Sequence, residues 1–529
     1  MFVLASPAIA LSVIPVAMLI ARAFTDRTGH SALFTAHALG TLTNTVYLAI
    51  LASIGAAVLG CIAGFAMGTS EWRGRAVFRT LLLIPLALPP YLHGIGWTTL
   101  LRPNGLLATS LTSLCGVRPS MPSETLQSIP GAAMILAFAY FPLIALFTEK
   151  SLALVPRSFS ETARVFGAGG FSIFRHAYWP AVRPAIFAGA ALTAIMTASE
   201  SGVPTLLKVR VFSFEVLTQL AAFNDVAAAT ILMFPLLLLG LLVLTILPAF
   251  IRADPADHGT GEFLPFPMVS RRGWWTRATL TAALLCISTL CPFSTVWLSG
   301  LAPDAWSAMA PLAAGPALQS IFHAVLAAAL AIAFAIGFGV CLRDTLGMRR
   351  TGIEFLLLVG FVIPSAILGL SLLELYGKPP WSEWIGGQAL VTGALFVRFQ
   401  IVAYYAITSS MRQIPSELYE AAELDGAGFW ARILFIDLPI LRTPVLITTV
   451  CLFILCMGDI GIIMLLHPPG GETLLLALFS IEANSPRSYV AVLTLLAAAL
   501  VIGPILIAAV AITISRETRL PDPQHLNRP

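Results

Sequence analysis

Runs of about 20 apolar residues recur along this chain and constrain its fold most, because a helix of that length spans a bilayer core. In lipid every backbone N–H and C=O group must be paired, which a helix achieves by itself. Charged residues are 11% of the 529 residues, against about 25% in an average soluble domain. We therefore predict an all-α polytopic membrane protein. The twelve predicted spans are 2–23, 44–67, 77–100, 130–149, 183–206, 227–251, 275–298, 317–341, 352–375, 387–410, 443–466 and 488–514.

Two polar segments between these spans are copies of one another. Residues 156–183 and 415–442 superpose without a gap when the sequence is shifted by 259 positions. An offset near half the chain length indicates an internal duplication. We predict two transmembrane halves of six helices, 1–251 and 274–529, joined by a linker at 252–273. The identical pairs are Pro156/Pro415, Glu161/Glu420, Ala163/Ala422, Gly167/Gly426, Ala168/Ala427, Gly169/Gly428, Pro180/Pro439 and Arg183/Arg442.

The second copy predicts a short helix, a turn and a helix that leads into a span. Pro415 suits a first helical turn, and Gly426 suits the left-handed conformation that ends a helix. Ala421 and Ala422 leave little side-chain bulk, so that another surface could approach closely. An amphipathic loop lying on the membrane is the alternative for one copy. Two copies at the same spacing argue against an accident.

At these residues the chain resembles the permease subunits of bacterial ABC importers. The family signature reads Glu-Ala-Ala, then Gly, then Ile-x-Leu-Pro. The second copy matches it throughout, whereas the first copy has Thr162, Ala177 and Trp179 at three of the places. The matching residues are Glu420, Ala421, Ala422, Gly426, Ile436, Leu438 and Pro439 in the second copy, and Glu161, Ala163, Gly167 and Pro180 in the first.

The resemblance implies a type I-like ABC importer permease, a transport subunit and not an enzyme, in the bacterial inner membrane. It implies that each signature loop is a coupling helix seated on a cytoplasmic ABC ATPase. The implied partners are two copies of that ATPase, which bind the ATP, a periplasmic solute-binding protein and membrane lipid. The three departures in the first copy put its detailed contacts in question.

The chain itself carries no ATPase motif. A P-loop requires Gly, four residues, Gly-Lys and then Ser or Thr. Of the three lysines only Lys378 follows a glycine, and Pro379 and Leu372 occupy the remaining key places. Energy must therefore come from another polypeptide, or from an ion gradient if the protein is instead a secondary transporter.

Basic residues predict the orientation. With both signature loops in the cytoplasm, 21 Arg and Lys residues lie inside and eight outside, and Arg398 falls within a span. The first apolar run could be mistaken for a cleaved signal peptide. It lacks a basic start and is longer than a signal core, so we expect it to be retained.

Two carboxylates stand at equivalent places of the duplication, Glu200 and Asp459, each about 17 residues into its span and so about 25 Å along it. An ionisable residue inside a membrane is costly and usually faces a cavity. Both could line a translocation path. Alternatively, both could accept hydrogen bonds where the helices loosen, near Gly202 and Gly461.

His93 and Arg398 are the other candidate path residues. His93 follows Pro89 and Pro90, which should kink its span, and Pro364 marks the corresponding kink in the second half. A lone histidine in a span is more often a packing partner than a ligand. For Arg398, pairing with a helix carbonyl and pairing with Glu420 are both open.

The transported solute is the least determined property. Residues 468–474 and 211–215 resemble stretches of fused iron(III) permeases, so we favour ferric iron, with thiamine or another small solute as the alternative. An ion-coupled secondary transporter using Glu200 and Asp459 is the rival of a different class. No nucleophile motif or His-rich cluster suggests a membrane enzyme, and the seven cysteines show no metal spacing. The net charge of +4 does not indicate nucleic-acid binding.

The orientation is testable with single cysteines in a cysteine-free chain. We predict that a cysteine at Ser416 resists a membrane-impermeant thiol reagent in intact cells. A cysteine at Ser485 should react, because residues 468–486 are predicted to face the opposite side. The reverse labelling pattern would overturn the orientation.

Overall fold

A computed structural model describes most of the chain. It covers residues 11, 13–18, 20–21, 35–68, 72, 74–102, 109, 112–113, 126–153, 155, 162–163, 165–221, 223, 225–232, 234–240, 242, 271–342 and 348–517. These residues form helices and turns and no strand. The predicted linker 252–273 lies outside them, apart from its last three residues.

The helices before the predicted linker are α3 (Ala36–Gly68), α4 (Arg75–Leu81), α5 (Leu83–Ala87), α6 (Pro90–Leu100), α9 (Ile129–Ala153), α11 (Gly170–Ile173), the π-helix η2 (Phe174–Tyr178), α12 (Trp179–Ser199), α13 (Gly202–Leu206), α14 (Phe212–Ala221) and α15 (Val226–Ile231). Those after it are α17 (Arg271–Leu285), the π-helix η3 (Cys286–Leu290), α18 (Cys291–Ser299), α19 (Pro303–Leu342), α20 (Met348–Val362), α21 (Ser365–Tyr376), α22 (Trp381–Trp384), α23 (Gly387–Met411), α24 (Ser416–Leu424), α25 (Phe429–Arg432), the π-helix η4 (Ile433–Asp437), α26 (Leu438–Gly458), α27 (Ile460–Leu466), α28 (Leu474–Glu482) and α29 (Arg487–Glu517).

Among the described residues, eight helices are long and apolar enough to cross a membrane, and two bent helix pairs raise the number to ten. The pairs, 75–100 and 354–376, bend by 90° and 103°. The predicted kinks at Pro89 and Pro364 are therefore confirmed. The expected spans 2–23 and 227–251 fall partly outside the described residues, so ten of the twelve expected spans have a counterpart.

The spans that follow the signature loops have different bounds from those predicted. They run over Gly170–Ser199 and Trp430–Gly458, instead of 183–206 and 443–466, and so end before Glu200 and Asp459. The helix enters each span through a π-helical turn, η2 or η4, directly before the Trp179–Pro180 or Leu438–Pro439 pair. A proline ring clashes with the carbonyl four residues earlier in an α-helix. A wider π-turn relieves that clash and lets the helix continue.

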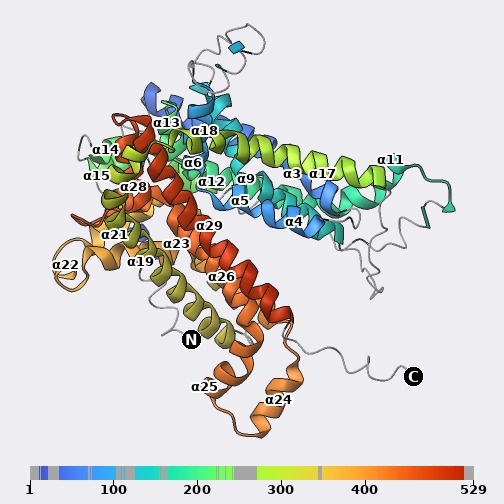
Figure 1. Cartoon of the computed structure of the whole chain (residues 1–529). Helices are drawn as coiled ribbons and strands as arrows, with labels where there is room; N and C mark the ends of the chain where they lie inside the picture. The colour runs from blue at the N-terminus through green and yellow to red at the C-terminus, as the bar shows by residue number, and fades with distance from the viewer. Residues whose placement is uncertain are drawn as a thin grey trace.

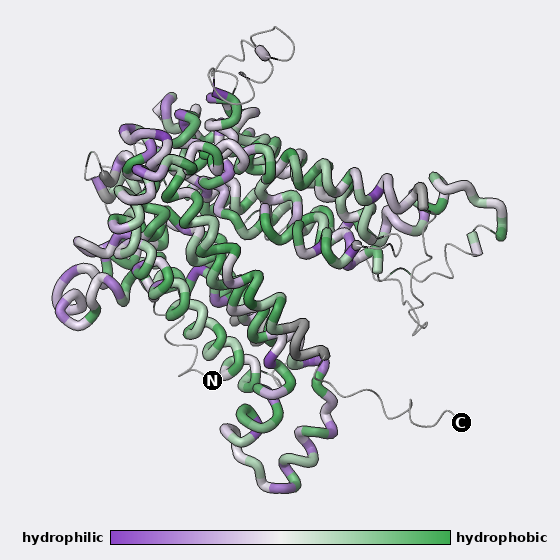
Figure 2. Tube along the Cα trace, in the orientation of Figure 1, coloured by the Kyte–Doolittle hydropathy of each residue, from purple (hydrophilic) through white to green (hydrophobic). Residues whose placement is uncertain are grey.

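The helices form two arms that diverge from a common head (Figure 1). One arm contains α3, α9 and α12, and the other contains α19, α23 and α26, with α24 and α25 at its tip. Both arms are largely apolar along their length, and polar residues gather at the tips and the head (Figure 2). Helices long enough to span a membrane therefore expose apolar side chains outward, as lipid requires.

The first span of each predicted half packs on the other half. α17 contacts α3 and α4, and α18 contacts α6. Conversely, Val16 belongs to the core cluster built mainly from α19, α23 and α26, and Leu11 lies beside Gly393 of α23. Helices from the two halves predicted from the sequence therefore pack against one another, and each half contributes its first span to the core of the other.

Small residues allow the central helices of each arm to approach closely. On α3, Gly60, Gly64 and Gly68 face α9, where a Cβ added to Gly64 would lie 2.6 Å from Thr148 Cβ. Small residues four apart are the common means of close helix packing in membranes. In the other arm α19 buries an alanine stripe in the core cluster that it shares with α23. The stripe contains Ala324, Ala327, Ala328, Ala331 and Ala335.

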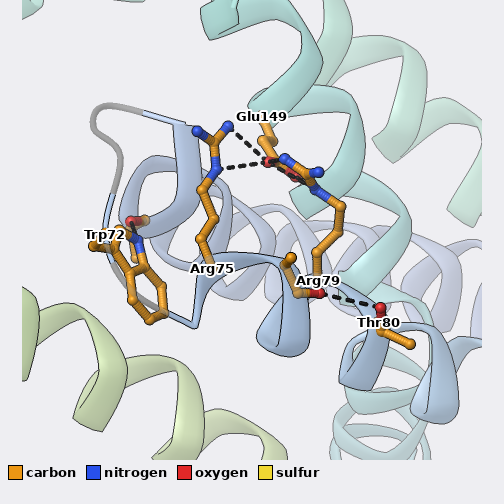
Figure 3. A network of polar contacts seen from close by, with 7 residues as sticks. Trp72, Arg75, Arg79, Thr80 and Glu149 are labelled. Atoms are coloured by element: carbon orange, nitrogen blue, oxygen red, sulfur yellow. Dashed lines mark hydrogen bonds and ion pairs between the residues drawn. The ribbon is translucent and has the colours of Figure 1, made fainter. Parts of the chain in front are cut away.

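A charged network joins α4 to the carboxyl-terminal end of α9 in the first arm (Figure 3). The buried Glu149 at the end of α9 pairs with Arg75 of α4, whose Nη2 lies 3.0 Å from Oε1, and with Arg79 of the same helix. In the second half a different polar contact joins the corresponding helices. The Tyr404 hydroxyl of α23 donates a hydrogen bond to Glu354 Oε1 of α20 at 3.0 Å. The two halves therefore share a framework but not its polar contacts.

The α3–α9 packing can be tested by enlarging one glycine. We predict that Gly64→Leu lowers the free energy of unfolding by about 3 kcal/mol, because overpacking forces two tightly packed helices apart. Gly40→Leu is the matched control on the same helix, where an added Cβ meets nothing within 4 Å. Thermal unfolding in detergent measures both. Equal melting temperatures for the two variants would contradict this account of the packing.

Candidate functional site

Four helix breaks meet around a cavity of about 100 Å³ in the head. The breaks separate α5 from α6, α12 from α13, α20 from α21, and α26 from α27. Each contributes a lining residue: Pro89, Glu200, Ser365 and Asp459, respectively. Both halves therefore supply two breaks, and the two carboxylates paired by the duplication line the same cavity.

Glu200 lies at the break between α12 and α13. Its Oε1 accepts hydrogen bonds from the backbone N–H groups of Gly202, at 2.8 Å, and Val203, at 3.4 Å. These N–H groups have no partner within α13, because the first turn of a helix leaves its donors free. A Cβ on Gly202 would lie 3.0 Å from this same carboxylate oxygen, so glycine permits the close approach.

Asp459 has the equivalent place in the second half but one more partner. Its Oδ1 accepts from the Ile462 N–H at 3.0 Å and so caps α27. Its Oδ2 lies 2.7 Å from Arg398 Nε in a buried ion pair. Gly461 provides the space here, since an added Cβ would overlap the Ser365 hydroxyl. The carboxylates therefore both cap helices and line the cavity.

Arg398 joins two breaks across the second half. Its Nη1 donates to the Ile363 carbonyl at 2.7 Å, in the bend between α20 and α21, and its Nε reaches Asp459. Of the two partners left open by the sequence, a backbone carbonyl is therefore confirmed. Glu420 is wrong as the charged partner, because the loop that carries it lies at the far end of the arm. Position 139, the repeat equivalent, is alanine, so the first half has no such pair.

His93 is not among the residues that line the cavity. The ring is fully buried, and Nε2 lies 2.9 Å from the Pro85 carbonyl oxygen. Its edge meets Phe293 of α18, with the ring centroids 6.0 Å apart. These contacts fit the packing role that a lone histidine in a span usually has.

The described part of the chain contains no group of three or more His, Cys, Asp or Glu side chains that could hold a metal ion. The cavity instead has two carboxylates and one guanidinium, together with Tyr140 and Ser201. These few polar groups lie among mainly apolar lining residues.

The signature loops have the same backbone design in both copies. Gly167 and Gly426 are left-handed, with φ of +78° and +74°, as predicted for Gly426. The next residue closes each turn, because Ala168 N–H donates to the Ala163 carbonyl at 2.9 Å and Ala427 N–H to the Ala422 carbonyl at 2.8 Å. These bonds are the mark of a Schellman helix end. After the turn, α11, η2 and α12 recur as α25, η4 and α26, shifted by 259 residues.

Most signature residues of the second loop are exposed. Glu420 and Ala421 are exposed and Ala422 is half-buried, all on α24. Ile436 and Leu438 pack against the core of the second half, and Pro439 lies in the first turn of α26. In the first loop, Gly167 is exposed and Pro180 begins α12. Glu161 lies outside the described residues.

Sequence reasoning missed two features of these loops. Large apolar side chains are exposed at repeat-equivalent positions, namely Val165 with Leu424 and Phe171 with Trp430. A buried hydrogen bond also joins Tyr419 to Asp437 within the second loop. The offset of 259 could have revealed the apolar pairs, but no sequence signal indicated the Tyr419–Asp437 contact.

Comparison with known proteins defines the class. Residues 56–254 match the family described as "Binding-protein-dependent transport system inner membrane component". Together with the spans described above, this match and the relatives below support a multi-pass inner-membrane permease of the binding-protein-dependent ABC type. Permeases of this family act with an ATPase and a solute-binding protein. The relatives found are transport permeases and not enzymes.

Two relatives cover most of the chain. The putative ferric transport system permease protein FbpB 1 of Haemophilus influenzae is 22% identical over 462 residues, 80% of this chain and 70% of the relative. The ferric transport system permease protein FbpB of Actinobacillus pleuropneumoniae is 21% identical over the same length, which is 64% of that relative. A putative 2-aminoethylphosphonate transport system permease protein, PhnV of Salmonella choleraesuis, is 25% identical over 250 residues, 44% of this chain and 93% of the relative.

The cavity ion pair yields a stability prediction. Asp459→Asn keeps the cap on α27 but leaves the Arg398 charge without its carboxylate. We predict a loss of about 3 kcal/mol in the free energy of unfolding, since breaking a buried ion pair leaves an uncompensated charge. The double variant Asp459→Asn/Arg398→Gln should recover most of that loss.

Glu200→Gln is the matched control, because it removes a cavity charge and keeps the cap but breaks no ion pair. Its melting temperature should stay near that of the parent. If Asp459→Asn melts at the parental temperature as well, the ion pair does not hold the breaks together.

Proposed function

We propose that the chain is the fused permease of a ferric iron importer, in which one translocation path runs between its two halves. The carrying observation is that the two ferric permease relatives align over 80% of this chain, and therefore over both halves. The cavity fits a hard cation, because its carboxylate and hydroxyl oxygens are the ligand type that such cations prefer.

Glu200 and Asp459 would line the path and Arg398 would neutralise one of them. Glu200 has no ion-pair partner among the described cavity residues, so its carboxylate oxygens would be available to a cation. Iron would be cargo, held only in passing, so no closed set of metal ligands is required. His93 has no part in this path.

The signature loops would each dock one ATPase subunit, giving two copies per permease. Docking is supported by the apolar side chains at the tips, because exposed apolar groups at equivalent places mark interaction sites. Val165 is 85% exposed and Leu424 is 90% exposed. The proposed docking residues of the signature are Glu161, Ala163, Gly167 and Pro180 in the first loop, and Glu420, Ala421, Ala422, Gly426, Ile436, Leu438 and Pro439 in the second.

In this mechanism, movement of the arm tips changes the shape of the cavity. Closure of the ATPase pair on ATP draws the two loops together, and the helices that follow the loops, α12 and α26, carry that movement to the breaks. The breaks then open toward the binding protein on the outer side. Rocking of two halves about a central site is the usual form of alternating access.

A phosphonate is the second candidate solute. It is favoured by the 2-aminoethylphosphonate permease relative and by Arg398, since a guanidinium binds phosphonate oxygens well. Against it, Arg398 already has two partners, and that relative covers less than half of this chain. An ion-coupled carrier does not fit the ABC permease class.

Reconstitution tests the proposal. The permease, its ATPase and its binding protein are placed in liposomes, and uptake of radioactive iron(III) is measured with and without ATP. We expect ATP-dependent accumulation of iron, unaffected by excess thiamine or 2-aminoethylphosphonate. Accumulation of labelled 2-aminoethylphosphonate or thiamine in place of iron would contradict the assignment of the solute.

The docking assignment predicts that Leu424→Ser weakens ATPase association about tenfold or more, because one buried leucine contributes about 1.5–3 kcal/mol at an interface. Folding should be unaffected, since the side chain is exposed. Trp384→Ser is the matched control, a tryptophan 84% exposed on α22, away from the loops. Co-purification of the ATPase in detergent measures both. Equal retention by the two variants would show that the loop tip is not the docking surface.

A further inference from the structure

One side chain anchors the second loop to the transmembrane body. All nine residues of α24 are described, and of these Tyr419 alone is buried. Its hydroxyl donates a hydrogen bond to Oδ1 of Asp437, which is fully buried in η4. The ring lies in the core cluster of the second half with Met411, Ile433 and Leu441. The remaining residues of α24 are exposed or half-buried.

The partner of Tyr419 belongs to a long continuous helix. η4 passes directly into α26, and the helical stretch from Ile433 to Gly458 is roughly 40 Å long at 1.5 Å per residue. The next residue is Asp459, which forms the cavity ion pair with Arg398. One buried hydrogen bond therefore connects the signature loop to a long helix, and the other end of that helix lies at the cavity, beside the break at Asp459.

The other polar connection of α24 is weak by comparison. Glu423 pairs with Arg432 of α25 at 2.7 Å, but the glutamate side chain is mostly exposed. Exposed ion pairs contribute little, because water screens them. At its ends α24 is joined through Pro415, which is extended, and the left-handed Gly426. Tyr419 therefore holds α24 at its middle, between these two points.

The first loop has no counterpart of this pair. Its residues at the equivalent positions are Ser160 and Tyr178, so no tyrosine–carboxylate bond can form there. The signature itself is shared by both loops and therefore does not explain the pair. This asymmetry matches that of the cavity, where the ion pair also belongs to the second half.

We infer that Tyr419 and Asp437 are positioning residues that transmit movement of the second loop to the cavity at Arg398 and Asp459. A hydrogen bond in a water-excluded site resists separation, because neither group can turn to solvent. Movement of α24 with its ATPase then moves η4 and α26 as one body. The inference rests on the proposed docking of an ATPase at this loop.

A cysteine reporter in the cavity tests this without reference to the solute. In the cysteine-free permease, assembled with its ATPase in liposomes, Ser201→Cys is labelled by an impermeant thiol reagent from the outer side. Trapping with ATP and vanadate should raise labelling in the parent. In Tyr419→Phe that rise should fall about fivefold or more, while ATPase binding and hydrolysis continue. Asp437→Asn, which keeps an acceptor for the hydroxyl, should retain most of the rise, and Asp437→Leu should not.

Tyr404→Phe is the matched control, because it removes another tyrosine–carboxylate bond of the second half, to Glu354, which joins α23 to α20 and does not involve α24. It should respond as the parent does. A parental response in Tyr419→Phe and Asp437→Leu overturns the inference, as does an equal loss in Tyr404→Phe. A parent that binds ATPase but shows no ATP-dependent labelling overturns the proposed mechanism of arm movement itself.

Discussion

The ion pair between Arg398 and Asp459 connects two of the helix breaks that surround the cavity. The arrangement of the cavity depends on how these breaks are stabilised. A break in a membrane helix leaves backbone N–H and C=O groups that lipid cannot satisfy. Here the Arg398 guanidinium donates a hydrogen bond to the Ile363 carbonyl, and the Asp459 carboxylate accepts one from the Ile462 N–H of α27. One ion pair therefore provides hydrogen-bond partners for backbone groups at two helix breaks. Glu200 does the same for α13. The same side chains thus bind the free backbone groups of the breaks and line the cavity.

A duplicated framework with unequal polar contacts is the recurring theme. Backbone features repeat closely, since the π-turns and the left-handed glycines of both signature loops recur at one offset. Polar contacts repeat only in part: Glu200 and Asp459 both accept from the N–H groups of the following helix, but other contacts differ. The cavity ion pair and the Tyr419–Asp437 bond belong to the second half, and the Glu149 network belongs to the first.

Sequence reasoning predicted the features that local chemistry determines. Apolar length located ten spans, proline located two bends, and glycine located the left-handed turn at Gly426. It placed Glu200 and Asp459 at equivalent sites, but inside helices, because hydropathy does not reveal that α12 and α26 end directly before them. The partner of Arg398 and the exchange of first helices depend on which surfaces meet in three dimensions, and no local pattern encodes that. The two-half division, the docking residues and the path residues stay predictions.

The central claim is that ATP-driven approach of the arm tips opens the cavity between the halves. Ala153 and Arg412 are repeat-equivalent, exposed residues at the inner ends of α9 and α23, outside the proposed docking surface. Spin labels at these two positions, in the permease assembled with its ATPase, report the separation of the arms. The account predicts a shorter distance on trapping with ATP and vanadate than without nucleotide. A distance distribution that does not change, with the ATPase bound and active, would contradict it.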